Sequence, residues 1–245
     1  MTSAPDPVLT DLPQDLQEAV AQTRRTVAEL HAELPRNGLV AWTAGNVSQR
    51  VPAHQDGPEL FVIKPSGVSY DDLTAENMVV CTLDGAKIDD GTADDLKPSS
   101  DTAAHAYVYR HMPEVGGMVH THSPYATAWA ARHEPIPCVL TMIADEFGGD
   151  IPVGPFALIG DDSIGQGIVE TLQNHRSKAV LMAGHGPFTI GKDAKAAVKA
   201  AVLCEETAMT VHVARQHGEP ERLSQEDIDK LFARYQNVYG QKKSA

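Results

Sequence analysis

Three histidines stand where their side chains could hold a metal ion. His120 and His122 close the apolar stretch GGMVHTH at residues 116–122 and flank one threonine. Side chains at positions i and i+2 of a β-strand point to the same face, so these two imidazoles face one point. A third histidine, His185, stands where the apolar stretch KAVLMAGHG breaks into a glycine turn. Three protein nitrogens with one open coordination position are typical of a catalytic divalent metal, most often zinc.

The histidine pattern leaves a second interpretation open. A His-x-His pair taken alone is more often a hydrogen-bonded pair at the end of a strand, because a buried imidazole needs partners for its nitrogens. The third histidine, at the end of another apolar stretch, favours the metal. The remaining histidines, His31 and His217 among them, lie in helix faces or polar loops and are expected to be solvated.

Three short segments share the chemistry of an anion pocket. TAGNVS at 43–48, KPSG at 64–67 and PSS at 98–100 combine small hydroxyl residues, glycines, one amide and one lysine. Glycine turns and helix N-termini present unpaired N–H donors, which a phosphate group needs. Each segment alone is more often a plain turn. Together they predict an anion pocket into which Lys64, at the end of the β-like stretch LFVIK, projects a positive charge. A metal beside such a pocket indicates a phosphorylated substrate.

The elements that must position these residues follow from periodicity and capping signals. Apolar positions spaced by three and four predict a helix over 14–34, whereas LVAW, LFVI and MVVCTL predict short strands between 39 and 83. Further helices are expected after Asp101, from Ser123-Pro124, from Asp193 to about 217 and from Ser224. The stretches at 116–122 and 178–186 are the remaining strands. No repeat or linker interrupts the chain, so we expect one mixed α/β domain.

Composition limits the classes of partner. The 245 residues include 20 Lys and Arg against 33 Asp and Glu, a net charge of -13 that repels nucleic acid and anionic membrane surfaces. No apolar stretch is long enough to cross a bilayer, and the start MTSAPDPVLTDLPQ lacks the features of a signal peptide, so a cytoplasmic location is expected. The odd number of widely spaced cysteines, in apolar contexts, predicts buried free thiols: Cys81, Cys138 and Cys204.

The chain resembles the class II aldolase and sugar-phosphate epimerase family, and within it the L-ribulose-5-phosphate 4-epimerases. The resemblance covers residues 15–241 and rests on GNVS, IKPSGVSYDDLT, KPSSDTAAH, MVHTHSPYAT, the HGPFTIGK segment at 185–192 and the terminal YGQ. It implies one three-layer α/β/α domain around a mainly antiparallel sheet, flanked by tails at 1–14 and 242–245. It also implies a C4 homotetramer whose active sites lie between neighbouring subunits.

The same resemblance assigns site residues. His120, His122 and His185 match the zinc histidines, with one zinc per subunit, and Asp101 matches the fourth residue of the metal site; such ligands also accept manganese or cobalt. Asp145 matches the catalytic aspartate, although TMIADEFGGDIP lacks the histidine and tyrosine that flank it in the family. Tyr239 matches a tyrosine contributed by the adjacent subunit. Six positions match those that hold the substrate phosphate: Asn46, Lys64, Ser66, Gly67, Ser99 and Ser100.

The residue after KPSS bears on which reaction to expect. By this resemblance, the matching position is a catalytic glutamate in the family's aldolases and an aspartate of the metal site in its epimerases. This chain has an aspartate there, Asp101. The resemblance therefore implies interconversion of L-ribulose 5-phosphate and D-xylulose 5-phosphate by cleavage and re-formation of the C3–C4 bond. Two alternatives stay open: a class II aldolase that releases its fragments, and a non-catalytic interaction module like the adducin head domains, which lack the metal-site histidines.

Overall fold

The structure, a computed structural model, describes residues 7–55 and 57–238. Within them, seven strands form one sheet in the order β3-β2-β1-β4-β7-β6-β5. Every neighbouring pair is antiparallel except β5 and β6. The strands are β1 (Asn46–Arg50), β2 (Leu60–Ile63), β3 (Val79–Thr82), β4 (Gly117–His120), β5 (Val153–Gly154), β6 (Ala179–Met182) and β7 (Gly186–Gly191).

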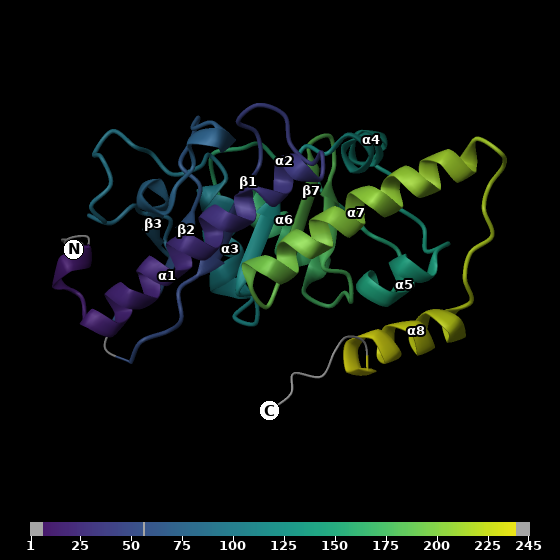
Figure 1. Ribbon diagram of the computed structural model, residues 1–245. Coiled ribbons are helices and arrows are strands. Elements are labelled where there is room, and N and C mark those ends of the chain that lie inside the picture. The colour runs from purple at the N-terminus through teal and green to yellow at the C-terminus, as the bar shows by residue number, and fades with distance from the viewer. Residues whose placement is uncertain (1–6, 56, 239–245) are drawn as a thin grey trace.

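Helices cover both faces of this sheet. They are α1 (Gln14–His31), α2 (Glu33–Arg36), α3 (Thr102–His111), α4 (Pro124–Arg132), α5 (Thr141–Phe147), α6 (Ser163–Leu172), α7 (Ala194–Arg215) and α8 (Gln225–Val238). Single 3-10 turns lie at Leu9–Asp11, Tyr70–Asp72 and Ala75–Asn77. Figure 1 shows α1 and α7 crossing the near face of the sheet, with α3 and α6 behind it. The expected three-layer α/β/α domain around a mainly antiparallel sheet is therefore confirmed.

The core explains why β2 is apolar at every position. In β2, Phe61 and Ile63 pack against α3 and α6 on one face, whereas Leu60 and Val62 pack against α1 on the other. A sheet buried on both faces needs apolar side chains at successive positions rather than alternate ones. Each fully buried side chain of this size contributes about 1.5–3 kcal/mol to the free energy of folding.

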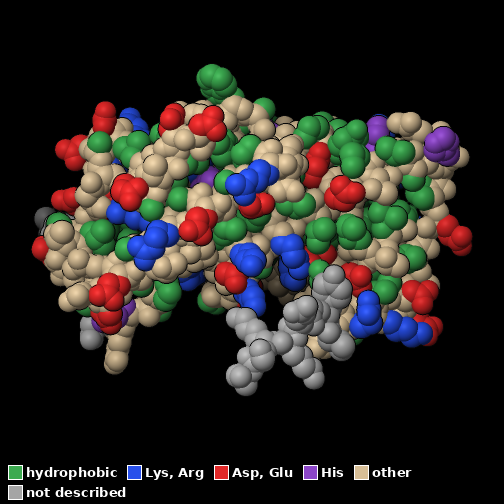
Figure 2. Space-filling view, in the orientation of Figure 1, with side chains coloured by type: hydrophobic (Ala, Val, Ile, Leu, Met, Phe, Trp, Pro, Cys, Tyr) green, Lys and Arg blue, Asp and Glu red, His purple; other side chains and the backbone are tan. Residues whose placement is uncertain are grey.

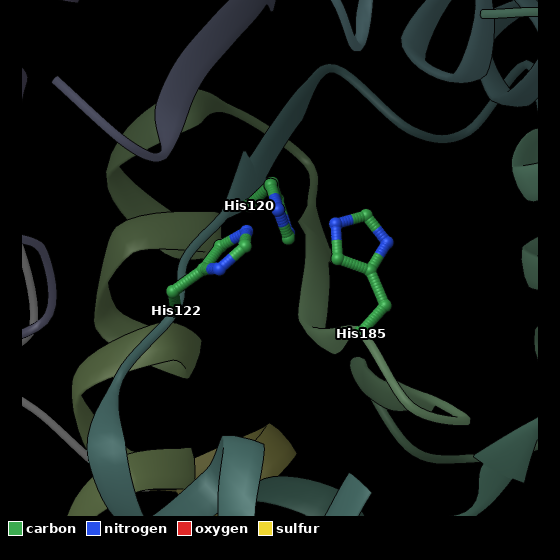
Figure 3. Close-up of side chains that lie close together, drawn as sticks. All are labelled: His120, His122 and His185. Carbon is green, nitrogen blue, oxygen red and sulfur yellow. The ribbon is translucent and has the colours of Figure 1, made fainter. Parts of the chain in front are cut away.

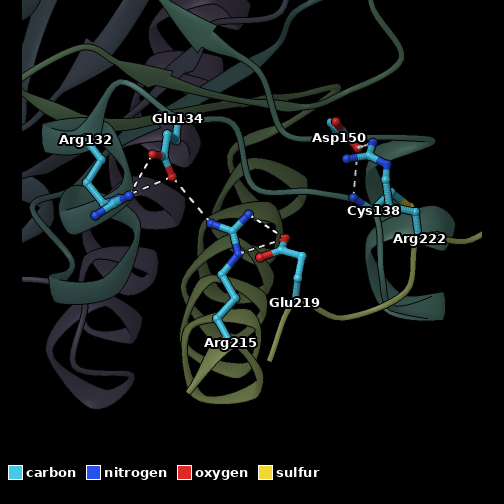
Figure 4. A network of polar contacts seen from close by, with 7 residues as sticks. All are labelled: Arg132, Glu134, Cys138, Asp150, Arg215, Glu219 and Arg222. Carbon is cyan, nitrogen blue, oxygen red and sulfur yellow. Dashed lines mark hydrogen bonds and ion pairs between the residues drawn. The ribbon is translucent and has the colours of Figure 1, made fainter. Parts of the chain in front are cut away.

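Ion pairs fasten the helices at the far end of the molecule. Figure 4 shows Arg132, at the end of α4, and Arg215, at the end of α7, both reaching Glu134, with N···O distances of 2.7 and 3.4 Å. Before α8 begins, Arg222 pairs with Asp150 at 2.5 Å, and the same carboxylate accepts the Cys138 amide at 2.8 Å. These contacts fix α7 and the start of α8 relative to the sheet.

Several local expectations are confirmed and some are wrong. Asp193 caps α7, with its carboxylate accepting the Ala196 amide at 2.7 Å, and all three cysteines are free and buried. The helix expected over 14–34 is divided into α1 and α2, which meet at Ala32. The expected strand LVAW is a loop, in which Trp42 has φ +58° and is 91% exposed. The segment does not continue as a strand because the chain turns at its end, where the Ala44 amide donates to the Ala41 carbonyl at 3.2 Å.

Charged side chains of both signs are spread over the surface. Figure 2 shows acidic and basic side chains interspersed over the face seen in Figure 1. None of the helices in the described residues combines the length and the hydropathy needed to cross a bilayer.

Candidate active site

Three histidines converge at one end of the sheet. His120 is the last residue of β4, His122 lies two residues further along the chain, and His185 lies in the turn between β6 and β7. Figure 3 shows the three rings turned toward one another. Their centroids are separated by 4.8 Å (His120 to His122), 4.6 Å (His120 to His185) and 5.2 Å (His122 to His185). β4 and β7 are neighbours, so the sheet itself brings the two histidine segments together.

The surroundings of His120 fix its tautomer. Its Nδ1 lies 3.1 Å from the carbonyl oxygen of Pro187, and its ring stacks on Phe188 with centroids 4.0 Å apart. A carbonyl can only accept, so Nδ1 carries the proton and Nε2 keeps its lone pair. Burial, followed by the neighbouring histidines, lowers the pKa of His120 well below its usual range. The imidazole is therefore neutral near pH 7, which is the state that binds metal ions.

The donor set fits a divalent metal. One ligand atom from each histidine lies within 4.8 Å of the others, and within the described residues no fourth histidine, cysteine or carboxylate joins this group. Three imidazoles with an open position are the ligand set of a catalytic zinc site. The hydrogen bond from His120 to Pro187 orients the ring in the way that outer partners of metal ligands do.

Asp101 lies beside the histidines at the start of α3. Although it occupies the N-cap position, its carboxylate does not cap the helix. Its Oδ2 accepts the amide of Asn46 at 2.7 Å, while its Oδ1 and the Asn46 Oδ1 are buried without hydrogen-bond partners within the described residues. Buried oxygens of this kind are costly unless they receive a ligand. Both residues line the same pocket as the histidines, so their free oxygens are available to a metal ion or a substrate hydroxyl.

The three segments expected to form an anion pocket meet at that pocket. The KPSG and PSS loops are joined by hydrogen bonds from the Ser99 amide to the Lys64 carbonyl and from the Ser66 amide to the Lys97 carbonyl, both 2.9 Å. Asn46, from the third segment, donates to the Ser99 hydroxyl at 3.0 Å. The pocket has a volume of about 360 Å³, and its lining includes the following residues singled out from the sequence: Asn46, Lys64, Ser66, Gly67, Ser99, Ser100, Asp101, His120, His122 and His185.

Lys64 behaves differently from the expectation of a freely projecting charge. Its side chain is buried, and its ammonium donates to the carbonyl oxygens of Thr43, Pro65 and Val68 at 3.3, 3.2 and 2.9 Å. Burial lowers its pKa to about 8, so it remains mainly positive at pH 7. Lys64 therefore holds the TAGN and KPSG loops together while it adds positive charge to the pocket.

Gly45 is required by its surroundings. It has φ +79°, and a Cβ atom at this position would lie 2.9 Å from the carbonyl oxygen of His120 and 2.7 Å from a methyl group of Val40. Neither the backbone conformation nor the space admits a side chain. The close packing of the TAGN loop on the end of β4 places Asn46 beside the histidines.

Asp145 is not brought to this pocket within one chain. It lies on α5, half-buried, and its backbone carbonyl accepts the side chain of Gln236 on α8 at 3.4 Å. The adjacent Glu146 is buried and pairs with Lys199 of α7 at 2.7 Å, and Figure 1 shows α5 between α7 and α8. The carboxylate oxygen Oδ1 of Asp145 is buried without a hydrogen-bond partner within the described part of the chain. Tyr239 lies outside the described residues.

Sequence reasoning missed two residues of this region. Ile159, from the loop before α6, lines the pocket although it belongs to no motif, and only the tertiary fold brings that loop to the histidine turn. His105, expected to be solvated, is fully buried one turn after Asp101. Its spacing of four from Asp101 on a helix was the signal that could have identified it.

Comparisons with known proteins give one family and a set of similar folds. The sequence profile of the class II aldolase and adducin N-terminal domain matches residues 25–212. An L-fuculose 1-phosphate aldolase structure is 24% identical with a TM-score of 0.78, covering 88% of this chain and 96% of its own. YgbL of Klebsiella pneumoniae, described as a candidate aldolase, epimerase or decarboxylase, is 29% identical with a TM-score of 0.73 over 86% and 98%. An aldolase II superfamily protein of Pseudomonas syringae is 20% identical with a TM-score of 0.75 over 94% and 88%.

Proposed function

Because the chain belongs to the class II aldolase and adducin N-terminal domain family, we propose that it is a zinc-dependent L-ribulose-5-phosphate 4-epimerase that produces D-xylulose 5-phosphate. One observation carries the proposal: a single pocket holds three metal-binding histidines beside a cluster of amide, hydroxyl and lysine donors. The family's aldolases have a glutamate at the position that Asp101 occupies here. The aspartate therefore favours the epimerase over the aldolase. The histidines disfavour a non-catalytic module, which has no use for a metal-ligand set.

The substrate determines which bond must break. The carbonyl of L-ribulose 5-phosphate is at C2, so the hydrogen on C4 is not acidic and cannot be removed directly. Loss of the C4 hydroxyl proton instead allows the C3–C4 bond to break, and its electron pair passes to the C2 carbonyl. The products are the enediolate of dihydroxyacetone and glycolaldehyde phosphate. Rotation of the aldehyde and re-addition to its other face invert C4.

A divalent metal held by His120, His122 and His185, with Asp101 beside it, supplies a Lewis acid that stabilises negative charge on the substrate oxygens. The pocket residues keep the phosphorylated fragment from leaving. The hydroxyls of Ser66, Ser99 and Ser100 and the backbone amide of Gly67 donate to the phosphate, and Lys64 adds a positive charge. Asn46 contributes by holding the Ser99 hydroxyl in place, because its two amide hydrogens are donated to Ser99 and Asp101. Retention of the aldehyde separates an epimerase from an aldolase that releases its fragments.

Two groups must move protons at the C4 oxygen, one on each face of the aldehyde. We assign Asp145 and Tyr239 to these roles. Since Asp145 lies outside the pocket of its own chain, the assignment requires a neighbouring subunit that brings it to the pocket. A homotetramer with shared active sites meets this requirement.

Product identification tests the proposal. Zinc-loaded protein is incubated with L-ribulose 5-phosphate and, separately, with L-fuculose 1-phosphate, and the sugars are identified by NMR. We expect D-xylulose 5-phosphate from the first substrate and no free fragments. Dihydroxyacetone with glycolaldehyde phosphate, or cleavage of L-fuculose 1-phosphate, would support the aldolase. A protein that binds no metal and changes neither sugar would support the interaction module.

A further inference from the structure

Three polar contacts join β1 to α3 behind the pocket. Every second residue of β1 on one face takes part: Asn46, Ser48 and Arg50. Their partners are spaced by four residues along α3 and its N-cap: Asp101, His105 and Tyr109. Asn46 donates to the Asp101 carboxylate at 2.7 Å, the Ser48 hydroxyl lies 2.6 Å from His105 Nδ1, and the Arg50 guanidinium donates to the Tyr109 carbonyl. The first contact lies in the pocket. The second and third contacts lie further from the pocket, and the proposed mechanism assigns no role to their residues.

The middle contact belongs to a hydrogen-bonded chain of three side chains. The Ser48 hydroxyl lies 2.7 Å from the Tyr109 hydroxyl as well as 2.6 Å from His105 Nδ1. All three side chains are buried, with 0 to 1% of their surface exposed. The Nε2 of His105 is also buried and has no hydrogen-bond partner within the described residues.

The order of donors in this chain follows from counting protons. If His105 Nδ1 donated to Ser48 and Ser48 to Tyr109, the phenol proton would have no acceptor, because Ser48 is its sole hydrogen-bond partner within the described residues. In the opposite order, Tyr109 donates to Ser48 and Ser48 donates to Nδ1, so both hydroxyl protons are used. The imidazole proton then lies on Nε2. This order leaves fewer buried polar groups unpaired and is therefore favoured.

A suitable acceptor for that proton lies one helical turn away. Asp101 precedes His105 by four residues, so their side chains share one face of α3. The Asp101 carboxylate has one buried oxygen without a partner, and its charge raises the pKa of His105 against the larger opposing effect of burial. The imidazole nevertheless remains neutral near pH 7, because burial lowers its pKa to about 3.

We propose that His105 is a positioning residue: Tyr109 and Ser48 hold its proton on Nε2, and the attraction of this N–H for the Asp101 carboxylate orients that carboxylate toward the metal site. No hydrogen bond joins the two groups within the described residues, whereas Asn46 donates to the other oxygen of the same carboxylate. Each carboxylate oxygen accepts two hydrogen bonds or ligands, so both oxygens keep lone pairs for a metal ion. The inference rests on the proposed function, because it concerns a residue assigned to that function's metal site.

Metal affinity and tautomer state test the inference without measuring turnover. The probe is Co²⁺, whose visible absorption reports the ligands around it, with affinity measured by competition against a chelator. We expect His105→Leu to weaken Co²⁺ binding by about 10- to 100-fold, as loss of an outer partner of a metal site does, and to change the absorption bands. His105→Gln, which keeps an N–H near the same place, should recover most of the affinity. In the wild-type protein, ¹⁵N NMR of the histidine rings should show His105 protonated on Nε2.

Two further variants separate positioning from stability. Ser48→Ala removes the hydroxyl that donates to His105 Nδ1, so it should release the His105 tautomer and weaken Co²⁺ binding, and it carries the test if His105→Leu does not fold. Thr207→Val, the control, removes a buried hydroxyl that bonds to carbonyls of its own helix α7. It should lower the unfolding temperature and leave Co²⁺ affinity unchanged.

Each contrary result has a distinct meaning. Equal Co²⁺ affinity and spectra in wild type, His105→Leu and Ser48→Ala would overturn the inference alone, as would a His105 ring protonated on Nδ1. An equal loss of affinity in Thr207→Val would show a general effect of stability and overturn it as well. A wild-type protein that binds no Co²⁺ would overturn the proposed function together with this inference.

Discussion

Asn46 lies directly opposite His120 in the antiparallel pair of β1 and β4. This one register position joins the two halves of the pocket. From it, the Asn46 amide reaches the Ser99 hydroxyl at 3.0 Å and the Asp101 carboxylate at 2.7 Å, while His120 faces the other histidines. Ser99 and Asp101 are therefore tied to the histidine end of the sheet through Asn46.

Replacing Asn46 by Ala should weaken both halves of the pocket. The change leaves the Asp101 carboxylate without its amide donor, so we expect a loss of about 1–3 kcal/mol in the free energy of unfolding. The KM for the phosphorylated sugar should rise by about 10-fold or more, since each 1.4 kcal/mol of lost binding is a factor of ten. Asn37→Ala is the control, because Asn37 is exposed and bonds only to Glu33 of its own turn. An unchanged KM in Asn46→Ala would contradict a role in substrate binding.

Metal removal should abolish turnover reversibly. Dialysis against a chelator is expected to remove one zinc per subunit, and added zinc should restore the activity. His120→Ala and His185→Ala should each lose at least about 10-fold in zinc affinity, because each removes one of three ligands. The control is His217→Ala at an exposed position. Full activity in metal-free protein would exclude the assigned role of the histidines.

Because of His31, the folded state should become less stable as the pH falls. It is buried, donates from Nδ1 to the Val27 carbonyl at 2.7 Å and accepts the Val47 amide at 2.9 Å, and burial lowers its pKa to about 3. The unfolded chain binds a proton below about pH 6.5 and the folded chain does not, so stability falls as the pH drops from 6.5 toward 3. Between pH 7 and 5, this group should cost about 2 kcal/mol of unfolding free energy.

Urea denaturation at the two pH values measures that cost. His31→Gln should be less stable than wild type at pH 7, but its further loss at pH 5 should be smaller by about 2 kcal/mol. Equal losses in both proteins would show that His31 is protonated in the folded state.

The proposed shared active site predicts complementation between inactive subunits. Asp145→Asn should retain zinc and lose epimerisation, because the pocket is intact and a proton-moving group is gone. His120→Ala should lose the metal. Dissociated and reassembled together, the two proteins should recover about a quarter of wild-type activity, since a site needs an intact pocket from one subunit and Asp145 from the next.

Tyr239→Phe should behave like Asp145→Asn in the same mixing experiment with His120→Ala. No recovery in mixed oligomers of verified composition would count against active sites built from two subunits. Undiminished turnover of Asp145→Asn by itself would remove that residue from the mechanism.

The sequence predicted the parts of the site that depend on local chemistry. Gly45, the KPSG loop and the His-x-His pair are recognisable because a turn, an anion or a metal demands those residue types at fixed spacing. The three-layer fold could be predicted only from resemblance, since strand order depends on pairings between residues far apart in the chain.

The errors arose where tertiary packing decides. His31 follows Val27 by four residues and so lies on the buried face of α1, yet a histidine is usually read as solvated. Ile159 lines the pocket only because the loop before α6 folds back over the histidine turn. Asp145 matches a motif, but the single chain holds it on α5 away from the pocket. Whether a second subunit supplies it depends on assembly, which local patterns do not encode.

The most direct test of the proposed chemistry is an NMR time course of zinc-loaded protein with L-ribulose 5-phosphate in D₂O. Cleavage and re-formation of the C3–C4 bond never breaks the C4–H bond. We therefore predict D-xylulose 5-phosphate that retains ordinary hydrogen at C4, without free dihydroxyacetone. Deuterium at C4 would contradict the cleavage mechanism, accumulation of the two fragments would identify an aldolase, and an unchanged spectrum would contradict the assigned substrate.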